Sequence, residues 1–324
     1  MRRLVSCLAA GVLLWAALPA GSASGQMMYW AESAGIHRAN LDGSAAQTVV
    51  AGFPDGLCVD PDAGKIYWTD NPPYGAPLGG RIRRADLNGA ADETLVSMLS
   101  YPLGIALQPA AGNVAAAKMY WTDASANEIR RADLDGSRPE MLVSKLTSPY
   151  GIALDTGGGK MYWTRNAVDA GLPAIQRAGL DGLGVEGLVK GFDGQTTAIA
   201  LDPAAGKMYW GYVDPYIDSI YAGMIKRSNL DGSEVEGIVS GLFFPAGIAL
   251  DLGAGKIYWT DTGRFLSDGT IRRADLDGAN AETLLDGLSG PRGIALDPTP
   301  EPASLALVAL GGLAALRRRR TRPA

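Results

Sequence analysis

Residues that commonly carry enzyme chemistry are scarce in this sequence. His37 is the single histidine among 324 residues. A serine–histidine–aspartate triad needs a histidine base, and a histidine metal cluster needs a second histidine. Related segments carry other residues at the position of His37, namely Arg83, Arg130, Gln176, Lys226 and Arg272. We therefore interpret His37 as an exposed, solvated side chain and expect no histidine-based catalysis.

Recurring carboxylates are the remaining candidates for chemistry. They end short apolar segments of the type Gly-Ile-Ala-Leu-Asp, at Asp60, Asp155, Asp202, Asp251 and Asp297. Gln108 interrupts the series. Acids at one position of every repeat are typical of turn and capping residues. Two alternatives stay open: a hydrolase that uses such carboxylates with a metal, and Ca²⁺ bound by an Asp-rich turn such as Asp133–Asp135, although no spacing matches a known calcium loop.

These carboxylates belong to a cassette that the sequence repeats. Its most visible part is a Tyr-Trp pair, found at Tyr29-Trp30, Tyr67-Trp68, Tyr120-Trp121, Tyr162-Trp163, Tyr209-Trp210 and Tyr258-Trp259. The one other tryptophan, Trp15, lies in a hydrophobic leader. Successive pairs are 38 to 53 residues apart. A period of roughly 40–50 residues built from short β-type segments is typical of propeller blades.

One full cassette, Gly247–Leu285, shows how four strands follow one another. Gly-Ile-Ala-Leu-Asp is a short apolar run, as expected of a strand buried on both faces. Lys-Ile-Tyr-Trp-Thr-Asp and Thr-Ile-Arg-Arg-Ala-Asp-Leu alternate between apolar and polar residues, and the second ends at an Asp-Gly turn. Ala-Glu-Thr-Leu-Leu forms a fourth, more polar segment. Four strands joined by tight turns predict one blade.

Two further parts of the cassette recur in phase with the Tyr-Trp pairs. The apolar segment occurs at 56–60, 104–108, 151–155, 198–202, 247–251 and 293–297. The Ile-x-Arg-Ala segment starts at Ile36, Ile82, Ile129, Ile175, Ile225 and Ile271, with departures at single positions. The folded part opens on a Tyr-Trp strand and ends on the apolar segment Gly293–Asp297. We therefore predict an all-β, six-bladed propeller with four antiparallel strands per blade, closed by the C-terminal strand, which completes the N-terminal blade.

The cassettes resemble the YWTD repeats, or class B repeats, of the low-density lipoprotein receptor family. The motif is intact at Tyr67-Trp68-Thr69-Asp70, Tyr120-Trp121-Thr122-Asp123 and Tyr258-Trp259-Thr260-Asp261. It departs at Tyr29–Glu32, Tyr162–Arg165 and Tyr209–Tyr212. The resemblance covers residues 27–298 and implies a six-bladed propeller in which the motif packs and hydrogen-bonds between blades. Because no cysteine-rich growth-factor module flanks the repeats, we carry over the fold and a binding-platform role, not receptor biology.

Both ends of the chain look like targeting signals. Residues 1–25 combine Arg2 and Arg3 with an apolar run and small residues, as a secretory signal peptide does. Residues 26–298 form the predicted propeller. In 299–324, Pro300-Glu301-Pro302 precedes the apolar stretch Ala303–Leu316, which is short of the about 20 residues of a membrane helix, and then Arg317–Arg320.

This C-terminal arrangement resembles the bacterial PEP-CTERM sorting signal. The resemblance implies that the tail is held transiently in the inner membrane and that an exosortase-type protease cuts near Pro300–Pro302. A permanent C-terminal membrane anchor is the alternative. Either interpretation places the propeller outside the cytoplasm, at the cell surface or in the extracellular matrix.

Composition narrows the choice of partners. The formal net charge is −5, and 7 of the 29 basic residues and 1 of the 34 acidic residues lie in the two terminal segments, so the propeller itself carries about −11. Such a chain repels phosphate backbones, which argues against nucleic-acid binding. Cys58, the one cysteine after the leader, fills an alanine position of the apolar segment and is interpreted as a small core residue. We expect no cofactor and a monomer.

Loop lengths point to one face of the predicted disc as a binding surface. Loops after the first and third strands of each blade are short and uniform, whereas loops after the second and fourth strands vary and carry aromatic residues. Recognition usually resides in variable loops on a rigid scaffold. The candidate binding residues are Tyr74, Tyr101, Tyr150, Tyr212, Tyr216, Tyr221 and Phe265. We therefore predict a non-catalytic binding or scaffold protein for a protein or glycan ligand; the alternatives are a propeller hydrolase or lactonase and a largely structural surface protein.

Overall fold

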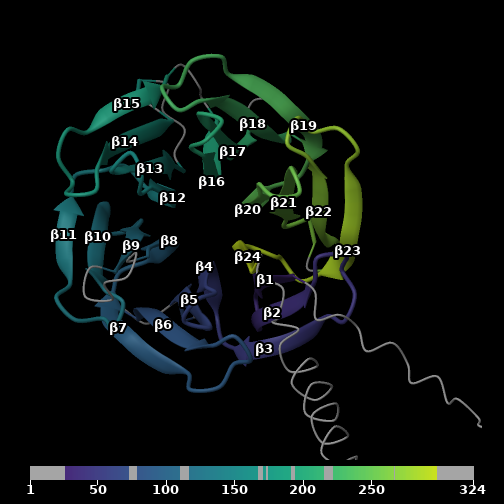
Figure 1. Ribbon diagram of the computed structural model, residues 1–324, viewed down its shortest axis with the longest axis horizontal. Coiled ribbons are helices and arrows are strands. Elements are labelled where there is room, and N and C mark those ends of the chain that lie inside the picture. The colour runs from purple at the N-terminus through teal and green to yellow at the C-terminus, as the bar shows by residue number, and fades with distance from the viewer. Residues whose placement is uncertain are drawn as a thin grey trace, which may run out of the picture. The chain divides into compact units, whose positions relative to one another are not determined.

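Six four-stranded sheets form a ring in the computed structural model (Figure 1). A channel lies at the centre of the ring. It describes residues 26–72, 79–109, 117–166, 171–172, 174–190, 194–214, 222–265 and 267–297. All regular elements in these ranges are strands, 24 in total. Within the same ranges no helix is long and apolar enough to span a membrane. The prediction of an all-β propeller with six blades of four antiparallel strands is confirmed.

We number the blades along the chain. Blade 1 contains β1 (Met27–Glu32), β2 (Gly35–Asn40), β3 (Gln47–Ala51) and the last strand, β24 (Ile294–Asp297). Blade 2 contains β4 (Pro54–Asp60), β5 (Lys65–Asp70), β6 (Gly80–Asp86) and β7 (Glu93–Leu99). Blade 3 contains β8 (Pro102–Gln108), β9 (Lys118–Asp123), β10 (Glu128–Asp133) and β11 (Glu140–Val143).

The second half of the ring repeats the same order. Blade 4 contains β12 (Pro149–Asp155), β13 (Lys160–Arg165), β14 (Ile175–Gly179) and β15 (Glu186–Val189). Blade 5 contains β16 (Gln195–Asp202), β17 (Lys207–Val213), β18 (Gly223–Asn229) and β19 (Glu236–Leu242). Blade 6 contains β20 (Pro245–Asp251), β21 (Lys256–Asp261), β22 (Gly269–Asp275) and β23 (Glu282–Leu288). The first strand of each blade, or β24 in blade 1, lies next to the channel (Figure 1).

The C-terminal strand closes the ring. β24 pairs antiparallel with β1, with Met28 opposite Leu296 and Trp30 opposite Ile294. Just before β24, the backbone N–H of Gly293 donates to the carbonyl of Asp55 in blade 2, at 2.9 Å. Blade 1 therefore receives its innermost strand from the far end of the chain and leaves no open sheet edge at the junction, as predicted.

Each Tyr-Trp pair joins its blade to both neighbours. Adjacent strand residues point to opposite faces of a sheet, so the tyrosine and the tryptophan of one pair enter different interblade cores. Trp121 of blade 3 packs in a cluster with Tyr67 of blade 2, and Trp163 of blade 4 packs with Tyr120 of blade 3. Trp30 packs with Tyr258, which closes the series. All twelve rings are at most 2% exposed.

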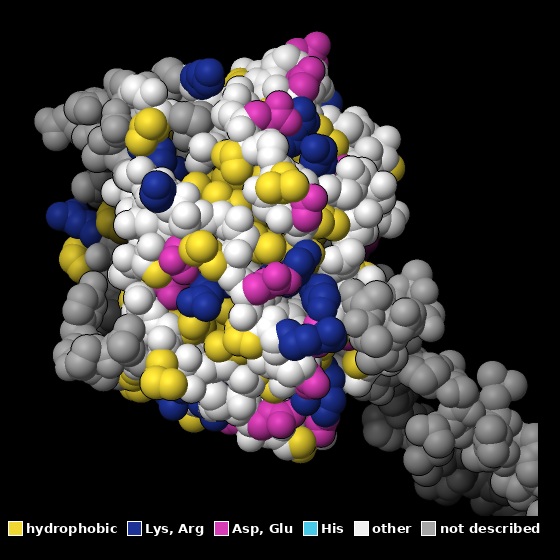
Figure 2. All heavy atoms as spheres, turned by 90° about the vertical axis from the view of Figure 1, so that its left-hand side faces the viewer, with side chains coloured by type: hydrophobic (Ala, Val, Ile, Leu, Met, Phe, Trp, Pro, Cys, Tyr) yellow, Lys and Arg dark blue, Asp and Glu magenta, His cyan; other side chains and the backbone are white. Residues whose placement is uncertain are grey.

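A second interblade contact uses the arginine two residues after the repeated Ile. Arg131 forms an ion pair with Glu140 on the neighbouring strand and lies over the Tyr120 ring, 5.7 Å from its centroid. Its Nη1 also donates to the carbonyl of Leu180 in the next blade, at 2.9 Å. The outer side of the molecule accordingly shows basic and acidic side chains next to each other (Figure 2). These arginines tie each third strand to the turn of the following blade.

His37 differs from the sequence-based interpretation. The side chain is half-buried rather than exposed, because its ring stacks on Trp30 with centroids 5.6 Å apart. The same position holds Arg83 over Trp68 in blade 2 and Arg272 over Trp259 in blade 6. The position therefore covers the motif tryptophan, and a flat ring or guanidinium suits this role.

Candidate ligand-binding site

The motif threonine fixes the first strand of its blade against the next one. Thr122 Oγ1 accepts from the backbone N–H of Gly104 at 2.9 Å and donates to the carbonyl of Tyr150 in blade 4 at 2.6 Å. Thr69 makes the equivalent bonds to Gly56 and Leu103 in blades 2 and 3. Each such threonine thereby anchors the residue that precedes the glycine of the neighbouring first strand.

The motif aspartate holds the loop that leads into the first strand. Asp123 accepts from the backbone N–H groups of Ser100 and Tyr101, both at 2.9 Å. Asp261 likewise accepts from Phe243 and Phe244. Charge-assisted bonds to backbone donors are strong, so the loops enter the channel mouth in a fixed conformation. Two aromatic residues of these loops, Tyr101 and Phe244, thereby acquire fixed positions at the mouth.

One position of the cassette varies strongly and lies at the channel mouth. It directly precedes the first-strand glycine, or Ala198 in blade 5, and holds Asp55, Leu103, Tyr150, Thr197, Ala246 and Arg292. All except Thr197, which is fully buried, line the mouth. The channel has a neck of about 90 Å³, bordered by the repeated Ile or Leu side chains, and a wider vestibule of about 360 Å³ above it.

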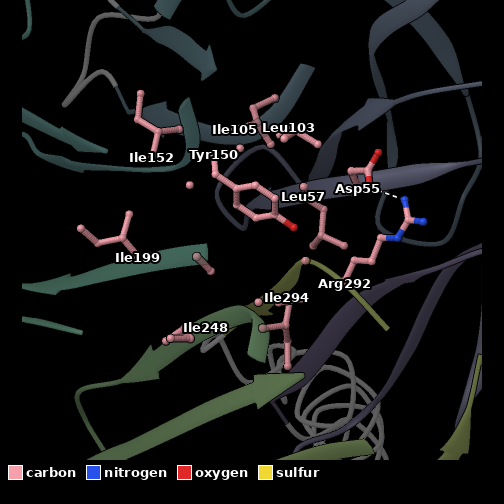
Figure 3. Close-up of a pocket in the computed structure, with 17 residues that line it drawn as sticks. Asp55, Leu57, Leu103, Ile105, Tyr150, Ile152, Ile199, Ile248, Arg292 and Ile294 are labelled. Atoms are coloured by element: carbon pink, nitrogen blue, oxygen red, sulfur yellow. Dashed lines mark hydrogen bonds and ion pairs between the residues drawn. The ribbon is translucent and has the colours of Figure 1, made fainter. Parts of the chain in front are cut away.

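Asp55 and Arg292 form an ion pair across the junction of blades 2 and 1 (Figure 3). Asp55 is only 6% exposed, and its second oxygen accepts from Asn71 Nδ2 at 2.6 Å. Burial opposes the charge on Arg292, but the adjacent Asp55 carboxylate outweighs it and raises the pKa of the guanidinium above its ordinary value. The guanidinium of Arg292 therefore stays charged beside the Asp55 carboxylate.

Tyr150 extends into the channel toward Leu57, near the Asp55–Arg292 pair (Figure 3). Burial is the main cause that raises the pKa of its phenol, and the charge of Asp55 adds to the effect. The hydroxyl is therefore neutral at physiological pH and can both donate and accept a hydrogen bond.

The vestibule combines aromatic and polar side chains. Its wall includes Tyr101, Tyr150 and Phe244 beside Asn166, Ser148, Thr262, Asp55 and Arg292. Asn166 Oδ1 is buried and accepts no hydrogen bond from the residues that the structure describes. An unpaired buried acceptor costs about 1–3 kcal/mol. Because this oxygen has almost no solvent-exposed surface, the amide must turn toward the vestibule before a bound molecule can reach it.

The structure brings together two of the seven predicted binding residues. Tyr101 and Tyr150 both line the vestibule, whereas Phe265 lies outside its wall, 66% exposed and beside Arg264. The assignment of Tyr212 to the variable loop is wrong. It is part of β17 and only 6% exposed, because β17 continues past the Tyr-Trp pair and packs Tyr212 into an interblade core. Tyr74, Tyr216 and Tyr221 lie outside the described residues.

Sequence reasoning missed Asp55, Arg292 and Asn166. The first two occupy the variable position before the repeated glycine, and that variation within otherwise uniform segments was the available signal. Asn166 follows directly after a departing copy of the YWTD motif, where Asn71 stands in blade 2. No local pattern marks it as a channel residue.

The recurring carboxylates at the opposite end of the first strands cap turns. Asp155 Oδ1 accepts from Gly158 N at 2.8 Å, and Asp251 Oδ1 accepts from Ala254 N at 2.9 Å. Asp202 does the same with Ala205. Across the described ranges, no three His, Cys, Asp or Glu side chains are grouped as a metal site would require. Cys58 packs against the core around Trp121, and burial raises the pKa of its thiol.

Comparisons with known proteins agree with the repeat and the tail. The family model of the low-density lipoprotein receptor repeat class B matches residues 117–156 and 255–298. The chain carries low-density lipoprotein receptor class B repeats. The PEP-CTERM protein-sorting motif matches residues 298–320 and indicates export. A propeller that carries class B repeats is thus combined with a sorting motif in this chain.

Individual relatives share part of the sequence or the fold. The chain is 29% identical to low-density lipoprotein receptor-related protein 1 of Pyricularia oryzae over 68% of its own length and 62% of that protein. It is 41% identical to low-density lipoprotein receptor-related protein 5 of Mus musculus over 26% of its length and 5% of that protein. Thus it spans less than two thirds of either relative. A chain in the crystal structure of a nidogen/laminin complex shares the fold, with a TM-score of 0.67, 22% identity and coverage of 84% of this chain and 98% of that one.

Proposed function

We propose that this exported class B repeat propeller is a non-catalytic binding module that recognises a protein or glycan through the channel vestibule and the loops around it. It acts at the cell surface or in the extracellular matrix, after an exosortase-type enzyme has removed the tail. The sorting motif supports the location. The receptor-type repeats support a binding role rather than catalysis.

The observation that carries this proposal is the variable position at the channel mouth. Interblade contacts need similar residues in every blade, and the Tyr-Trp pairs and repeated arginines meet that need. The position before the repeated glycine has a different side chain in each blade, and five of its six residues line the mouth. A scaffold that is uniform inside and varied around a pocket is suited to recognition.

A binding experiment with matched variants tests the proposal. Exopolysaccharide and surface-protein extract from the producing cells would each be incubated with the exported protein, and retained protein would be quantified. Tyr150→Ala and Arg292→Gln should reduce retention on one of the two materials by about tenfold, the order expected when a residue at the centre of an interface is truncated. The melting temperature of each variant would be recorded to confirm folding.

Leu183→Ser provides the control on the opposite face. Leu183 lies in the turn between β14 and β15 and is 72% exposed, so its replacement should leave retention unchanged. Retention that depends on Leu183 but not on Tyr150 or Arg292 would contradict the proposed surface. Absence of retention on both materials would contradict a binding role.

A further inference from the structure

Three side chains in the vestibule have hydrogen-bonding capacity that the described residues do not use. Asn166 Oδ1 is a buried acceptor without a donor. Arg292 has five N–H donors, and among the described residues its side chain donates to Asp55 alone. Tyr150 forms no side-chain hydrogen bond with those residues, although its ring lies at the neck. Tyr150 lies on β12, Arg292 just before β24 and Asn166 directly after β13.

The combination of donors and acceptor limits the chemistry of a ligand. A carboxylate could accept from Arg292 but has no proton to donate to Asn166. An ammonium group could donate to Asn166 but could not accept from Arg292. A hydroxyl does both. A molecule with several hydroxyl groups can therefore satisfy Asn166, Arg292 and Tyr150 at once.

Charge also disfavours an acidic ligand. Asp55 already neutralises Arg292, so the wall presents hydrogen-bond donors without net positive charge. The propeller itself carries about −11, since 7 of the 29 basic residues but only 1 of the 34 acidic residues lie in the terminal segments. An acidic polymer would be repelled over the whole surface. A neutral ligand meets no such barrier.

Shape favours a flat, compact ligand. The vestibule of about 360 Å³ lies at the lower end of the roughly 300–1,000 Å³ range of small-molecule pockets. The neck below it has about 90 Å³, a quarter of the volume of the vestibule. Tyr101, Tyr150 and Phe244 supply apolar aromatic surface beside the polar groups. A sugar ring has apolar C–H faces and a rim of hydroxyl groups, which complement this lining.

We propose that the vestibule binds one neutral sugar unit at the end or branch of a polysaccharide. This inference rests on the proposed function and names its ligand class. The ring contacts the aromatic side chains, and its hydroxyl groups accept from Arg292. The Asn166 amide, whose oxygen is shielded in the unbound structure, turns toward the sugar and accepts from a further hydroxyl. Tyr150 closes the bottom of the site and contributes its hydroxyl.

Saturation-transfer NMR with the exported protein would test this inference. The probes are neutral hexoses, N-acetylhexosamines and their short oligosaccharides, with uronic acids and short synthetic peptides as separate arms. At least one neutral sugar should bind. Asn166→Ala and Tyr150→Phe should each lower the affinity for that sugar by about five- to tenfold, the range for loss of one hydrogen bond. Phe265→Ala, an aromatic change on an exposed loop outside the vestibule wall, should leave it unchanged.

The outcomes separate this inference from the proposed function. Preference for uronic acids would overturn the neutral class, and binding of peptides without any sugar would overturn the sugar class. Sugar binding unaffected by Asn166→Ala and Tyr150→Phe would place the sugar elsewhere and overturn the site. In each case, the binding role stands if retention of the protein on exopolysaccharide or surface-protein extract still depends on Arg292. If retention no longer depends on Arg292, the proposed function is contradicted as well.

Discussion

Thr197 occupies the space that a side chain at Gly211 would need. In blade 5 the motif threonine is replaced by Gly211, and a Cβ there would collide with Thr197 Oγ1 and with the backbone carbonyl of Pro245. Thr197 instead supplies the hydroxyl that bridges to the next blade, through a bond to the carbonyl of Pro245. The bridging hydroxyl has thus moved from the second strand to the first, and the glycine accommodates it.

This relationship predicts coupled effects on stability. Gly211→Ala should destabilise the domain by about 1–3 kcal/mol through overpacking, and Thr197→Ala by about 1 kcal/mol through loss of the bridge. The double variant should be more stable than the sum of the two changes predicts, because Thr197→Ala removes the nearer of the two atoms with which the new Cβ collides. The contact with the Pro245 carbonyl remains, so the double variant should still be less stable than the wild type. Urea unfolding of the four proteins measures the coupling. Strict additivity would contradict the compensation.

Ring closure predicts that the last strand is indispensable. A chain ending at Arg292 lacks β24 and exposes the edge of β1, so it should unfold at a much lower temperature or aggregate. A chain ending at Asp297 keeps β24 and serves as the matched control. Thermal unfolding followed by circular dichroism and light scattering provides the measurement. Equal melting of the two chains would mean that closure contributes nothing to stability.

The fold was predictable because every blade repeats its signals. A single Tyr-Trp pair is ambiguous, but several parts of the cassette in phase define blade number and strand order together. Tyr212 was misplaced because the motif ends as Tyr-Trp-Gly-Tyr, while β17 continues to Val213 and pairs Tyr212 with Met224. Sequence alone does not show where an atypical copy stops being a strand.

The candidate site was only partly predictable, for a topological reason. Asp55 and Arg292 are 237 residues apart in sequence and meet because the ring closes between blades 1 and 2. Their pairing also depends on Asn71 from the end of the second strand. Tyr101 and Tyr150 were foreseeable because loop aromatics in a propeller lie on one face. The variation before the repeated glycine marks the position, but the sequence of either copy alone does not show which residue of a distant copy it contacts.

The repeated arginine predicts a difference between two chemically similar substitutions. Arg131→Lys should destabilise the domain by about 1–2 kcal/mol, since lysine cannot reproduce the forked contact with Glu140, the ring contact with Tyr120 and the bond to Leu180 together. Arg264→Lys is the control, because that side chain is exposed and its described contact is with its loop neighbour Phe265. Urea unfolding should therefore separate the two variants, and equal midpoints would contradict a role for Arg131 between blades.

The contacts of Asp133 predict that the domain loses part of its stability at low pH. Its hydrogen bond with Lys118 is the main cause that lowers the pKa of this carboxyl from 3.8 to about 2, and Arg138 adds to the effect. A lowered native pKa means that the stabilisation is present above pH 3.8 and is lost as the pH falls through about 2. Asp133→Asn should therefore melt below the wild type at neutral pH, and the difference should shrink between those values. Asp286→Asn, an exposed change on β23, should show no such convergence.

The sorting motif predicts the mass of the exported protein. Pro300-Glu301-Pro302 precedes a short apolar stretch and Arg317–Arg320, and the motif match covers residues 298–320. If an exosortase-type enzyme cuts near the motif, the intact mass of protein from its native host should lack the apolar stretch and the four arginines. Replacing Pro300-Glu301-Pro302 by three alanines should retain the tail and leave the protein with the membrane fraction. A native mass that includes Arg317–Arg320 would instead identify the tail as a permanent anchor, because uncleaved basic residues hold the apolar stretch in the inner membrane.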